Sequence, residues 1–257
     1  HRCRMADPGG RHAASVGKGP PGPGIPRRTG VSMNVLLTGA AGQLGRALQD
    51  CKPDSVELTS IDIDELDITS ESDTLDRVRG VSPDRIINTA SYTAVDLAES
   101  NRDAAYAVNA QGARNLALAA KAVGAGFLHL STDYVFDGRQ TTPYLPDAHP
   151  SPLGVYGQSK LQGEQLILQA YPERSAIIRT AWLYSPYGKN FLLTMLRLMA
   201  ERDEIRVVAD QVGTPTSAAT LAEALWRMCA LEHCRGIHHW TDLGVASWYD
   251  FAVAIQE

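Results

Sequence analysis

From Asn34 onward, short apolar runs alternate with stretches in which apolar residues recur every three or four positions. The runs predict strands at NVLLTG, VELTSID, DRIINTA, GFLHLST and SAIIRTA. The stretches between them predict helices at residues 43–51 and 104–123, a short helix before DRIINTA, and a helix that carries Tyr156. Strands joined by such helices form right-handed crossovers in a parallel sheet. The sequence therefore predicts a doubly wound α/β fold of the Rossmann type.

After Arg179 the alternation is less regular. An aromatic-rich loop, WLYSPYGKNF, precedes a predicted helix at residues 191–200 and a predicted strand, IRVVAD. The loop QVGTPTS, a helix at 218–231, a strand at GIHHW and a helix starting at Ser247 follow. We therefore expect a dinucleotide-binding domain at residues 33–180. Residues 181–257 should form a smaller substrate lobe interleaved with late crossovers of the sheet and truncated at its C-terminal end.

The first 32 residues differ from the rest in composition. They hold seven Gly, five Pro, six Arg or Lys and one acidic residue. Such a segment buries too little apolar surface to offset the entropy of ordering, so we expect a disordered tail and a natural start at Met33. With six basic residues and one acidic residue in the tail, the whole-chain charge of −5 leaves −10 for the remainder. That acidic body argues against a nucleic-acid partner.

The overall composition is that of a globular protein: 44% of the 257 residues are apolar and 21% are charged. No apolar run approaches the ~20 residues that cross a bilayer, and no stretch near the first residues shown has the charged, hydrophobic and cleavage regions of a signal peptide in order. We therefore expect a cytoplasmic protein without a membrane partner. The segment CALEHCRGIHH fits no standard zinc spacing, and we expect no metal site. The cysteines are too scattered for a disulfide framework: Cys3, Cys51, Cys229 and Cys234.

A glycine-rich turn follows the first predicted strand. In TGAAGQLGRAL, Gly39, Gly42 and Gly45 have GxxGxxG spacing and open a helix, whose N-terminus would hold a cofactor pyrophosphate. This context favours dinucleotide binding over a structural turn. Asp62, after the second strand, would accept hydrogen bonds from the adenosine ribose and repel a 2′-phosphate, which favours NADH. Three neighbours compete for that role: Asp64, Glu65 and Asp67.

Three residues at the carboxyl edge of the predicted sheet could perform hydride-transfer chemistry. Tyr156 and Lys160 are four positions apart and share a helical face, a spacing that also occurs by chance on solvated helices. Thr132 ends the strand GFLHLST, where open α/β sheets bind ligands. With that threonine in front, we predict that Thr132 holds a carbonyl oxygen and Tyr156 protonates it. Lys160 would lower the pKa of the phenol and hold the nicotinamide ribose.

With these residues in place, the chain resembles the extended short-chain dehydrogenase/reductases, and among them the dTDP-4-dehydrorhamnose reductase family. The resemblance implies reduction by NADH or NADPH of the C4 keto group of dTDP-6-deoxy-L-lyxo-4-hexulose to dTDP-L-rhamnose, a precursor of cell-surface polysaccharides. The matching stretches cover nearly all of residues 33–257: MNVLLTGAAGQLG, ASYTAVDLAE, VNAQGARNLA, STDYVFDG, SPLGVYGQSKLQGE, RTAWLYSPYGKNF and DQVGTPTSA.

The resemblance also implies the binding residues. The catalytic set is Thr132, Tyr156 and Lys160. The cofactor would contact Gly39, Gly42, Gln43, Leu44, Gly45, Asp62, Asp67, Ile68, Asn88, Thr89, Ala90, Ser91, Tyr156 and Lys160. The dTDP-sugar would contact Thr93, Val95, Asp96, Thr132, Asp133, Trp182, Asn190 and Phe191, with GTPT at residues 213–216 on the far side. From the residues alone, core packing is the better interpretation of Trp182.

Three departures from related patterns bear on function. Ile63 stands where family members often carry an arginine for the 2′-phosphate of NADPH, which again favours NADH. Tyr134 stands where the related 4,6-dehydratases carry a glutamate that eliminates water, which argues against dehydration. The resemblance also implies that the family continues for several dozen residues beyond the position of Glu257, with an arginine that helps to hold the dTDP pyrophosphate and so contributes to substrate affinity.

Two alternatives stay open. The first is another sugar-nucleotide ketoreductase or epimerase that uses the same threonine, tyrosine and lysine. The second is a non-catalytic regulatory subunit resembling the β subunit of methionine adenosyltransferase, against which the sugar-side stretch YTAVDLAES argues. The sequence is compatible with a monomer or a homodimer, and it does not determine a requirement for Mg²⁺.

Overall fold

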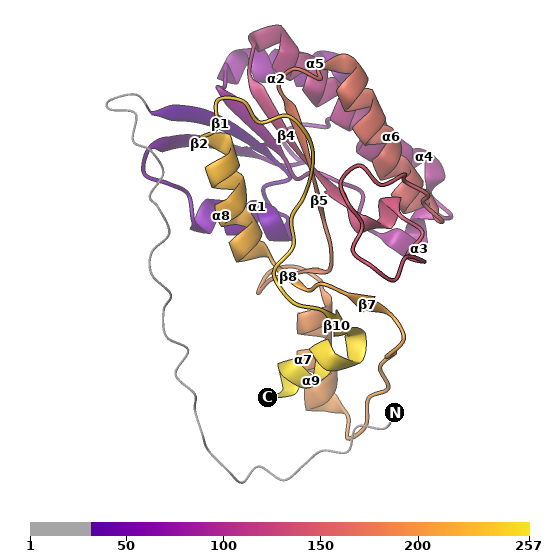
Figure 1. The fold of residues 1–257 in the computed structure, drawn as a ribbon. Helices are drawn as coiled ribbons and strands as arrows, with labels where there is room; N and C mark the ends of the chain where they lie inside the picture. The colour runs from indigo at the N-terminus through magenta and orange to yellow at the C-terminus, as the bar shows by residue number, and fades with distance from the viewer. Residues whose placement is uncertain (1–31) are drawn as a thin grey trace.

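The structure is a computed structural model, and it describes residues 32–257. The predictions for the preceding residues, including the disordered tail and Cys3, lie outside them. The central sheet has six parallel strands in the order β2 (Val56–Ile61), β1 (Met33–Thr38), β3 (Arg85–Asn88), β4 (Gly126–Thr132), β5 (Ser175–Thr180) and β9 (Gly236–His239). The order reverses direction between β1 and β3, where open α/β sheets bind ligands. The predicted doubly wound α/β fold is confirmed (Figure 1).

Helices cover both faces of the sheet because each strand carries apolar side chains on both sides. On one face lie α1 (Gln43–Asp50) and α8 (Ala218–Cys229). On the other lie α2 (Glu71–Val81), α5 (Ala113–Val123) and α6 (Val155–Ala170) (Figure 1). The late helix α8 thus packs against the first helix of the chain.

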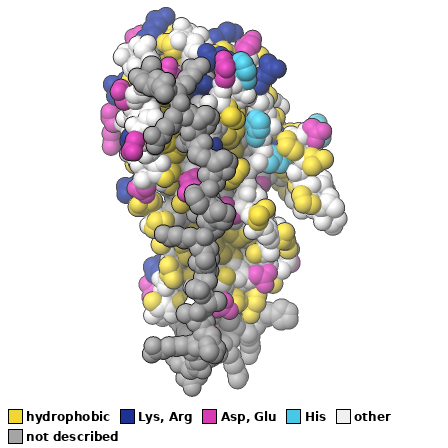
Figure 2. Space-filling model, turned by 60° about the vertical axis from the view of Figure 1, so that its left-hand side comes forward, with side chains coloured by type: hydrophobic (Ala, Val, Ile, Leu, Met, Phe, Trp, Pro, Cys, Tyr) yellow, Lys and Arg dark blue, Asp and Glu magenta, His cyan; other side chains and the backbone are white. Residues whose placement is uncertain are grey.

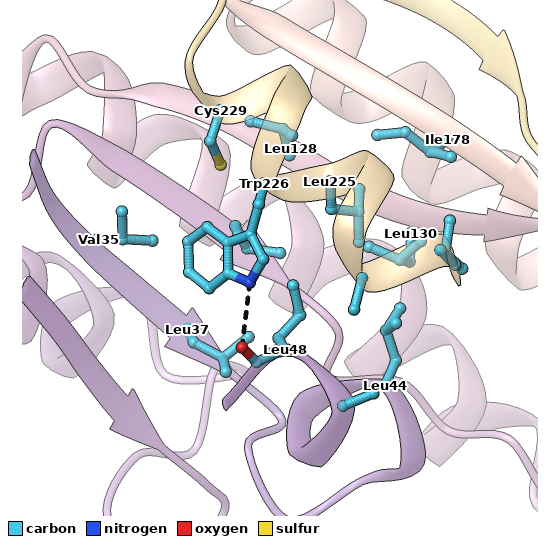
Figure 3. Packing of buried hydrophobic residues seen from close by; sticks show 14 of the residues in the cluster. Val35, Leu37, Leu44, Leu48, Leu128, Leu130, Ile178, Leu225, Trp226 and Cys229 are labelled. Atoms are coloured by element: carbon cyan, nitrogen blue, oxygen red, sulfur yellow. Dashed lines mark hydrogen bonds between the residues drawn. The ribbon is translucent and has the colours of Figure 1, made fainter. Parts of the chain in front are cut away.

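Trp226 of α8 joins these early and late elements. Its ring lies among apolar side chains of β1, β4 and α1, with Leu44 and Leu48 beneath it (Figure 3). The indole Nε1–H donates to the Leu48 carbonyl oxygen at 3.0 Å, which satisfies the polar atom of an otherwise apolar side chain. This packing fixes α1, and with it the glycine-rich turn that opens α1.

The helix predicted at residues 104–123 contains a wider turn in its middle. It runs through α4 (Arg102–Tyr106), a π-helical turn at Ala107–Gly112 and then α5. A π turn inserts a residue into the α-helical ladder and is common at functional sites. Here it carries the buried Asn109 against α6. Two further short elements flank the sheet edge: α3 (Val95–Ala98) and a 3₁₀ turn at Asp133–Val135.

Beyond β5 the described chain forms short elements below the sheet. β6 (Leu183–Tyr184) pairs with β8 (Thr216–Ser217), and β7 (Val212–Gly213) pairs with β10 (Ala246–Ser247). The helices α7 (Phe191–Glu201) and α9 (Trp248–Gln256) pack together beside them (Figure 1). The division of the chain after residue 180 stays a prediction.

The prediction of a strand at IRVVAD is wrong. Residues 205–210 form no strand. Ile205 and Val207 are half-buried, and they line a small cavity together with Met199 of α7 and Val253 of α9. Their period-two spacing is therefore that of a half-buried segment beside two helices, and Val208 is 52% exposed.

The described surface mixes charge with apolar side chains. Figure 2 shows acidic and basic side chains interspersed on the upper part of one face and hydrophobic side chains gathered further down. Within residues 32–257, every helix is too short or too polar to cross a membrane.

Candidate active site

A cavity of about 770 Å³ opens at the carboxyl ends of the strands, beside the reversal of strand order. It extends from the glycine-rich turn to the start of α6. Most of the predicted site residues line it: Gly39, Gly42, Gln43, Leu44, Asp62, Asp67, Ile68, Thr89, Ala90, Ser91, Thr93, Val95, Thr132, Asp133, Tyr156, Lys160 and Trp182. Five individually predicted residues are not in the lining, and neither is the predicted GTPT segment at residues 213–216; the five are Gly45, Asn88, Asp96, Asn190 and Phe191.

The glycine-rich turn lies close to the backbone of the loop after β3. Gly39 has φ +74°, and a Cβ there would lie 2.5 Å from the Ala90 amide nitrogen. A Cβ at Gly45 would overlap the carbonyl oxygen of Gly39, so this glycine lets α1 pack onto the turn. The floor of the cavity is therefore bare backbone at the N-terminus of a helix, which suits a pyrophosphate.

Replacing Gly39 by Ala is expected to weaken NADH binding by at least about tenfold. The left-handed backbone at Gly39 disfavours alanine by ~1–3 kcal/mol. If the turn shifts to relieve this strain, it moves away from the position of the phosphate. Gly80→Ala is the matched control, because Gly80 lies inside α2 with open space around it; we expect ~0.5–1 kcal/mol of added stability and unchanged affinity. Fluorescence titration with NADH measures both variants. Equal affinities in the two would contradict the role of the turn.

Two acidic residues of the loop after β2 have different tasks. The Asp62 carboxylate accepts the backbone N–H groups of Ala41, at 2.7 Å, and Ile63, at 2.8 Å, so it is fixed at the cavity wall next to the glycine turn. Asp67 accepts from the backbone N–H and the hydroxyl of Thr69 and so stabilises its own turn. Asp62 is thus the better placed of the two to meet a ribose. Ile63 beside it is 63% exposed.

Thr132 and Tyr156 meet at the opposite end of the cavity. The Thr132 hydroxyl donates to Asp133 Oδ1 at 3.1 Å and accepts from the Tyr134 amide at 3.2 Å. Burial raises the pKa of Tyr156 to about 12, against the opposing effect of its hydrogen bond with Thr132. The expectation that Lys160 lowers the pKa of this phenol is not met: burial is the largest cause of the raised pKa, and Lys160 is not among its causes.

Lys160 is buried behind the tyrosine. Its Nζ donates to the Leu130 carbonyl oxygen at 2.6 Å and lies 3.3 Å from Nε2 of His129. Burial lowers the pKa of Lys160 to about 8, although the charge of Glu164 acts in the opposite direction. Burial also raises the pKa of Asp133 to about 6. Near neutral pH, therefore, the cavity end holds a neutral phenol, an ionised Asp133 and a lysine close to its own pKa.

Two residues that sequence reasoning missed position α6. A Cβ at Gly157 would overlap the Tyr134 carbonyl oxygen, so glycine lets the first turn of α6 lie against the 3₁₀ turn that follows β4. Asn109 of the π turn accepts from the Ser91 hydroxyl and the Tyr92 amide, each at 2.8 Å, and donates to the Ser159 hydroxyl at 3.0 Å. The sequence carried only a weak signal for this role, a polar asparagine inside an alanine-rich helix.

The aromatic wall of the cavity contains a second tryptophan that was not predicted. Trp182 and Trp248 both line the cavity and stack with ring centroids 3.5 Å apart. Trp182 has φ +46°, an uncommon conformation for a bulky residue. It therefore packs against another side chain and also faces the cavity. A signal for Trp248 lay in SWYD, since Ser247 and Asp250 form a capping box that fixes the start of α9.

The predicted residues outside the lining support it. Asn88 lies beneath the cavity, where its side chain contacts Thr38 and His129. Asn190 caps α7 and donates to Gln43 at 2.8 Å. Phe191 packs on Trp248 with ring centroids 4.6 Å apart. Within residues 32–257, no group of three or more His, Cys, Asp or Glu residues is arranged to hold a metal ion.

Comparison with known proteins gives matches along the whole described region. A family model described as the RmlD substrate binding domain matches residues 33–257. A dTDP-4-dehydrorhamnose reductase of Aggregatibacter actinomycetemcomitans is 44% identical over 228 residues, which cover 86% of this chain and 77% of that protein. The crystal structure of a Bacillus anthracis dTDP-4-dehydrorhamnose reductase in complex with NADP is 42% identical, with a TM-score of 0.85, and the match covers 88% of this chain and 81% of that one. A Clostridium acetobutylicum dTDP-4-dehydrorhamnose reductase is 44% identical, with a TM-score of 0.84 and coverage of 87% and 79%.

Proposed function

This chain belongs to the RmlD family of dTDP-4-dehydrorhamnose reductases, and on that premise we propose that it reduces the C4 keto group of dTDP-6-deoxy-L-lyxo-4-hexulose to give dTDP-L-rhamnose. The family resemblance indicated by the motifs is confirmed. The reaction is an oxidoreduction that uses a nicotinamide cofactor. Its product supplies the synthesis of cell-surface polysaccharides.

The observation that carries the proposal is the content of one cavity. Gly39 and Asp62 lie at one end, where the bare turn and the carboxylate fit a dinucleotide. Thr132, Tyr156 and Lys160 lie at the other end. Gly39 lets the turn lie against the Ala90 backbone, and Gly42, Gln43 and Leu44 at the N-terminus of α1 line the cavity, so the residues present fit the pyrophosphate of the cofactor.

The side chains at the far end suit proton transfer to a carbonyl oxygen. A reduced nicotinamide supplies the hydride when it is bound. The Thr132 hydroxyl turns from Asp133 to hold the carbonyl oxygen. Because its pKa is about 12, Tyr156 keeps its proton throughout the working pH range and gives it to that oxygen. Trp182 and Trp248 close the sugar side of the cavity and exclude water.

The cofactor preference that we propose is NADH. Asp62 and the apolar Ile63 give a 2′-phosphate no cationic partner. Ile63→Arg is expected to raise the NADPH-to-NADH ratio of kcat/KM by at least about tenfold, since one charge-assisted hydrogen bond is worth ~1.5–3 kcal/mol. Ile63→Leu is the control and should leave the ratio unchanged. A wild-type enzyme that already prefers NADPH would contradict the assignment.

The direct test is turnover of enzymatically generated dTDP-6-deoxy-L-lyxo-4-hexulose, followed by the loss of NADH absorbance and by identification of the product. We expect dTDP-L-rhamnose in stoichiometric amount with the NADH consumed. If the protein binds NADH but reduces only a different sugar-nucleotide ketone, the assigned substrate would be wrong and the assigned type of reaction would stand. A protein that binds NADH and reduces no such ketone would overturn the reductase proposal itself.

A further inference from the structure

Below the cavity, a line of buried polar side chains connects β1, β3 and β4 with α6. Asn88 of β3 stands directly beside His129 of β4 in the sheet register. His129 lies between Asn88 and Lys160, and all three are at most 2% exposed. His129 was not among the predicted site residues, and none of the steps proposed above uses it. The directions of these hydrogen bonds can be derived one at a time.

The orientation of the Asn88 amide is fixed by its neighbours. Its Oδ1 accepts the backbone N–H of Ala90 at 3.0 Å and the hydroxyl of Thr38 at 2.7 Å. A backbone N–H can only donate, so this atom is the oxygen of the amide. Nδ2 therefore faces His129 Nδ1, at 2.9 Å. Because an amide nitrogen also only donates, His129 Nδ1 carries no proton and accepts.

The same geometry then fixes the proton on the other ring nitrogen. Burial, and next the charge of Lys160, lower the pKa of His129 well below its ordinary value, so the ring is neutral and carries one proton. With Nδ1 as an acceptor, that proton is on Nε2, which lies 3.3 Å from Lys160 Nζ. An ammonium has no lone pair, so this contact is a hydrogen bond only when Lys160 is a neutral amine.

We propose, on the basis of the reductase function above, that His129 is a positioning residue whose Nε2–H stabilises the neutral amine of Lys160, so that this lysine can lose and regain a proton in each turnover. After Tyr156 has given its proton to the carbonyl oxygen, the resulting tyrosinate is converted back to the phenol by a proton that comes, in net, from the Lys160 ammonium. The His129 Nε2–H then donates a hydrogen bond to the neutral Lys160 amine until this amine takes a proton from water. A pKa near the ambient pH suits such a donor.

The other charged groups around Lys160 do not supply this effect. Glu164, one turn further along α6, favours the ammonium. Its carboxylate is already paired with Arg179 of β5 at 2.6 Å. Tyr156, one turn earlier, is a neutral phenol below its pKa of about 12. Of Glu164, Tyr156 and His129, it is therefore His129 that donates a hydrogen bond to the neutral Lys160 amine.

The test uses nitrogen NMR on the ¹⁵N-labelled chain without cofactor or substrate, with Lys160→Met to assign the lysine signal. We expect His129 Nδ1 to show the shift of an unprotonated nitrogen and Nε2 that of a protonated one. We expect the Lys160 titration, near pH 8, to move up by about one pH unit in His129→Leu. In His129→Gln it should stay near the wild-type value, because the amide N–H can donate in place of the ring. The alkaline limb of kcat/KM should move with it.

A protonated Nδ1, or a Lys160 titration that is unchanged or lowered in His129→Leu, would overturn the proposal. Should His129→Leu fail to fold, the wild-type tautomer and the His129→Gln titration decide it. The NMR result is independent of turnover. A protein with the expected tautomer and shift that reduces no sugar nucleotide would contradict the proposed function but leave the link between His129 and Lys160 in place.

Discussion

Replacing Tyr156 by Phe is expected to lower kcat/KM for the keto-sugar by about 10²–10⁴-fold, with little change in the affinity for NADH. The phenol is the proton donor in the proposed reaction, and its pKa of about 12 keeps it protonated at every working pH. Phenylalanine keeps the ring and its edge-to-face contact with Tyr134, whose centroid is 5.6 Å away. The loss should therefore fall on the chemical step, and steady-state kinetics together with an NADH titration would measure it.

The control for this variant is the neighbouring phenol. Tyr134 also lines the cavity but is 49% exposed, and its backbone amide is what bonds to Thr132. Tyr134→Phe keeps that amide, so kcat/KM should stay within a few-fold of the wild-type value. The proton donor would have to be reassigned if Tyr134→Phe lost activity as severely as Tyr156→Phe, or if Tyr156→Phe kept it.

Replacing Glu164 by Gln is expected to lower the free energy of unfolding by ~3–5 kcal/mol, because it leaves the Arg179 guanidinium buried without a counter-charge. The pair is bidentate: Nε of Arg179 lies 2.9 Å from Oε1 of Glu164, and Nη2 lies 2.6 Å from Oε2. Both side chains are at most 3% exposed, and Ser131 donates to the same carboxylate. Urea unfolding measures the effect.

Two comparisons separate burial from simple charge pairing. Glu65→Gln breaks the exposed pair with Arg77, at 3.3 Å, and should change stability by no more than ~0.5 kcal/mol. Replacing both Glu164 and Arg179 by Met should recover most of the free energy of unfolding lost in Glu164→Gln, since no unpaired buried charge remains. A Glu164→Gln variant as stable as Glu65→Gln would show that this buried pair contributes little.

Much of the fold and the outline of the site could be predicted because their signals are local. The alternation of apolar runs with helical periods predicted the parallel sheet, and a glycine turn between a strand and a helix predicted the dinucleotide end of the cavity. The four-residue spacing of Tyr156 and Lys160 predicted a shared helical face. Each pattern depends on residues within one or two turns of each other, and backbone geometry fixes what they can form.

Other features needed partners that are far apart in the chain. IRVVAD has the period of a strand but forms none, and Ile205 and Val207 line a small cavity with residues of α7 and α9. The roles of Asn109 and His129 became visible only when α6 and β3 lay beside them, and that of Trp248 only when α9 lay beside Trp182. The raised pKa of Tyr156 likewise comes from burial, which reverses the effect expected from a nearby lysine.

The sequence by itself thus determined the order of the elements along the chain, the parallel sheet and the chemical groups expected at the carboxyl ends of its strands. The tertiary structure decided which of those groups are desolvated, which hydrogen bonds they make and in which direction, and hence which proton each one carries. The physical reason is that desolvation and hydrogen-bond direction depend on every group packed around an atom, and in this chain those groups come from β1, β3, β4 and α6 together.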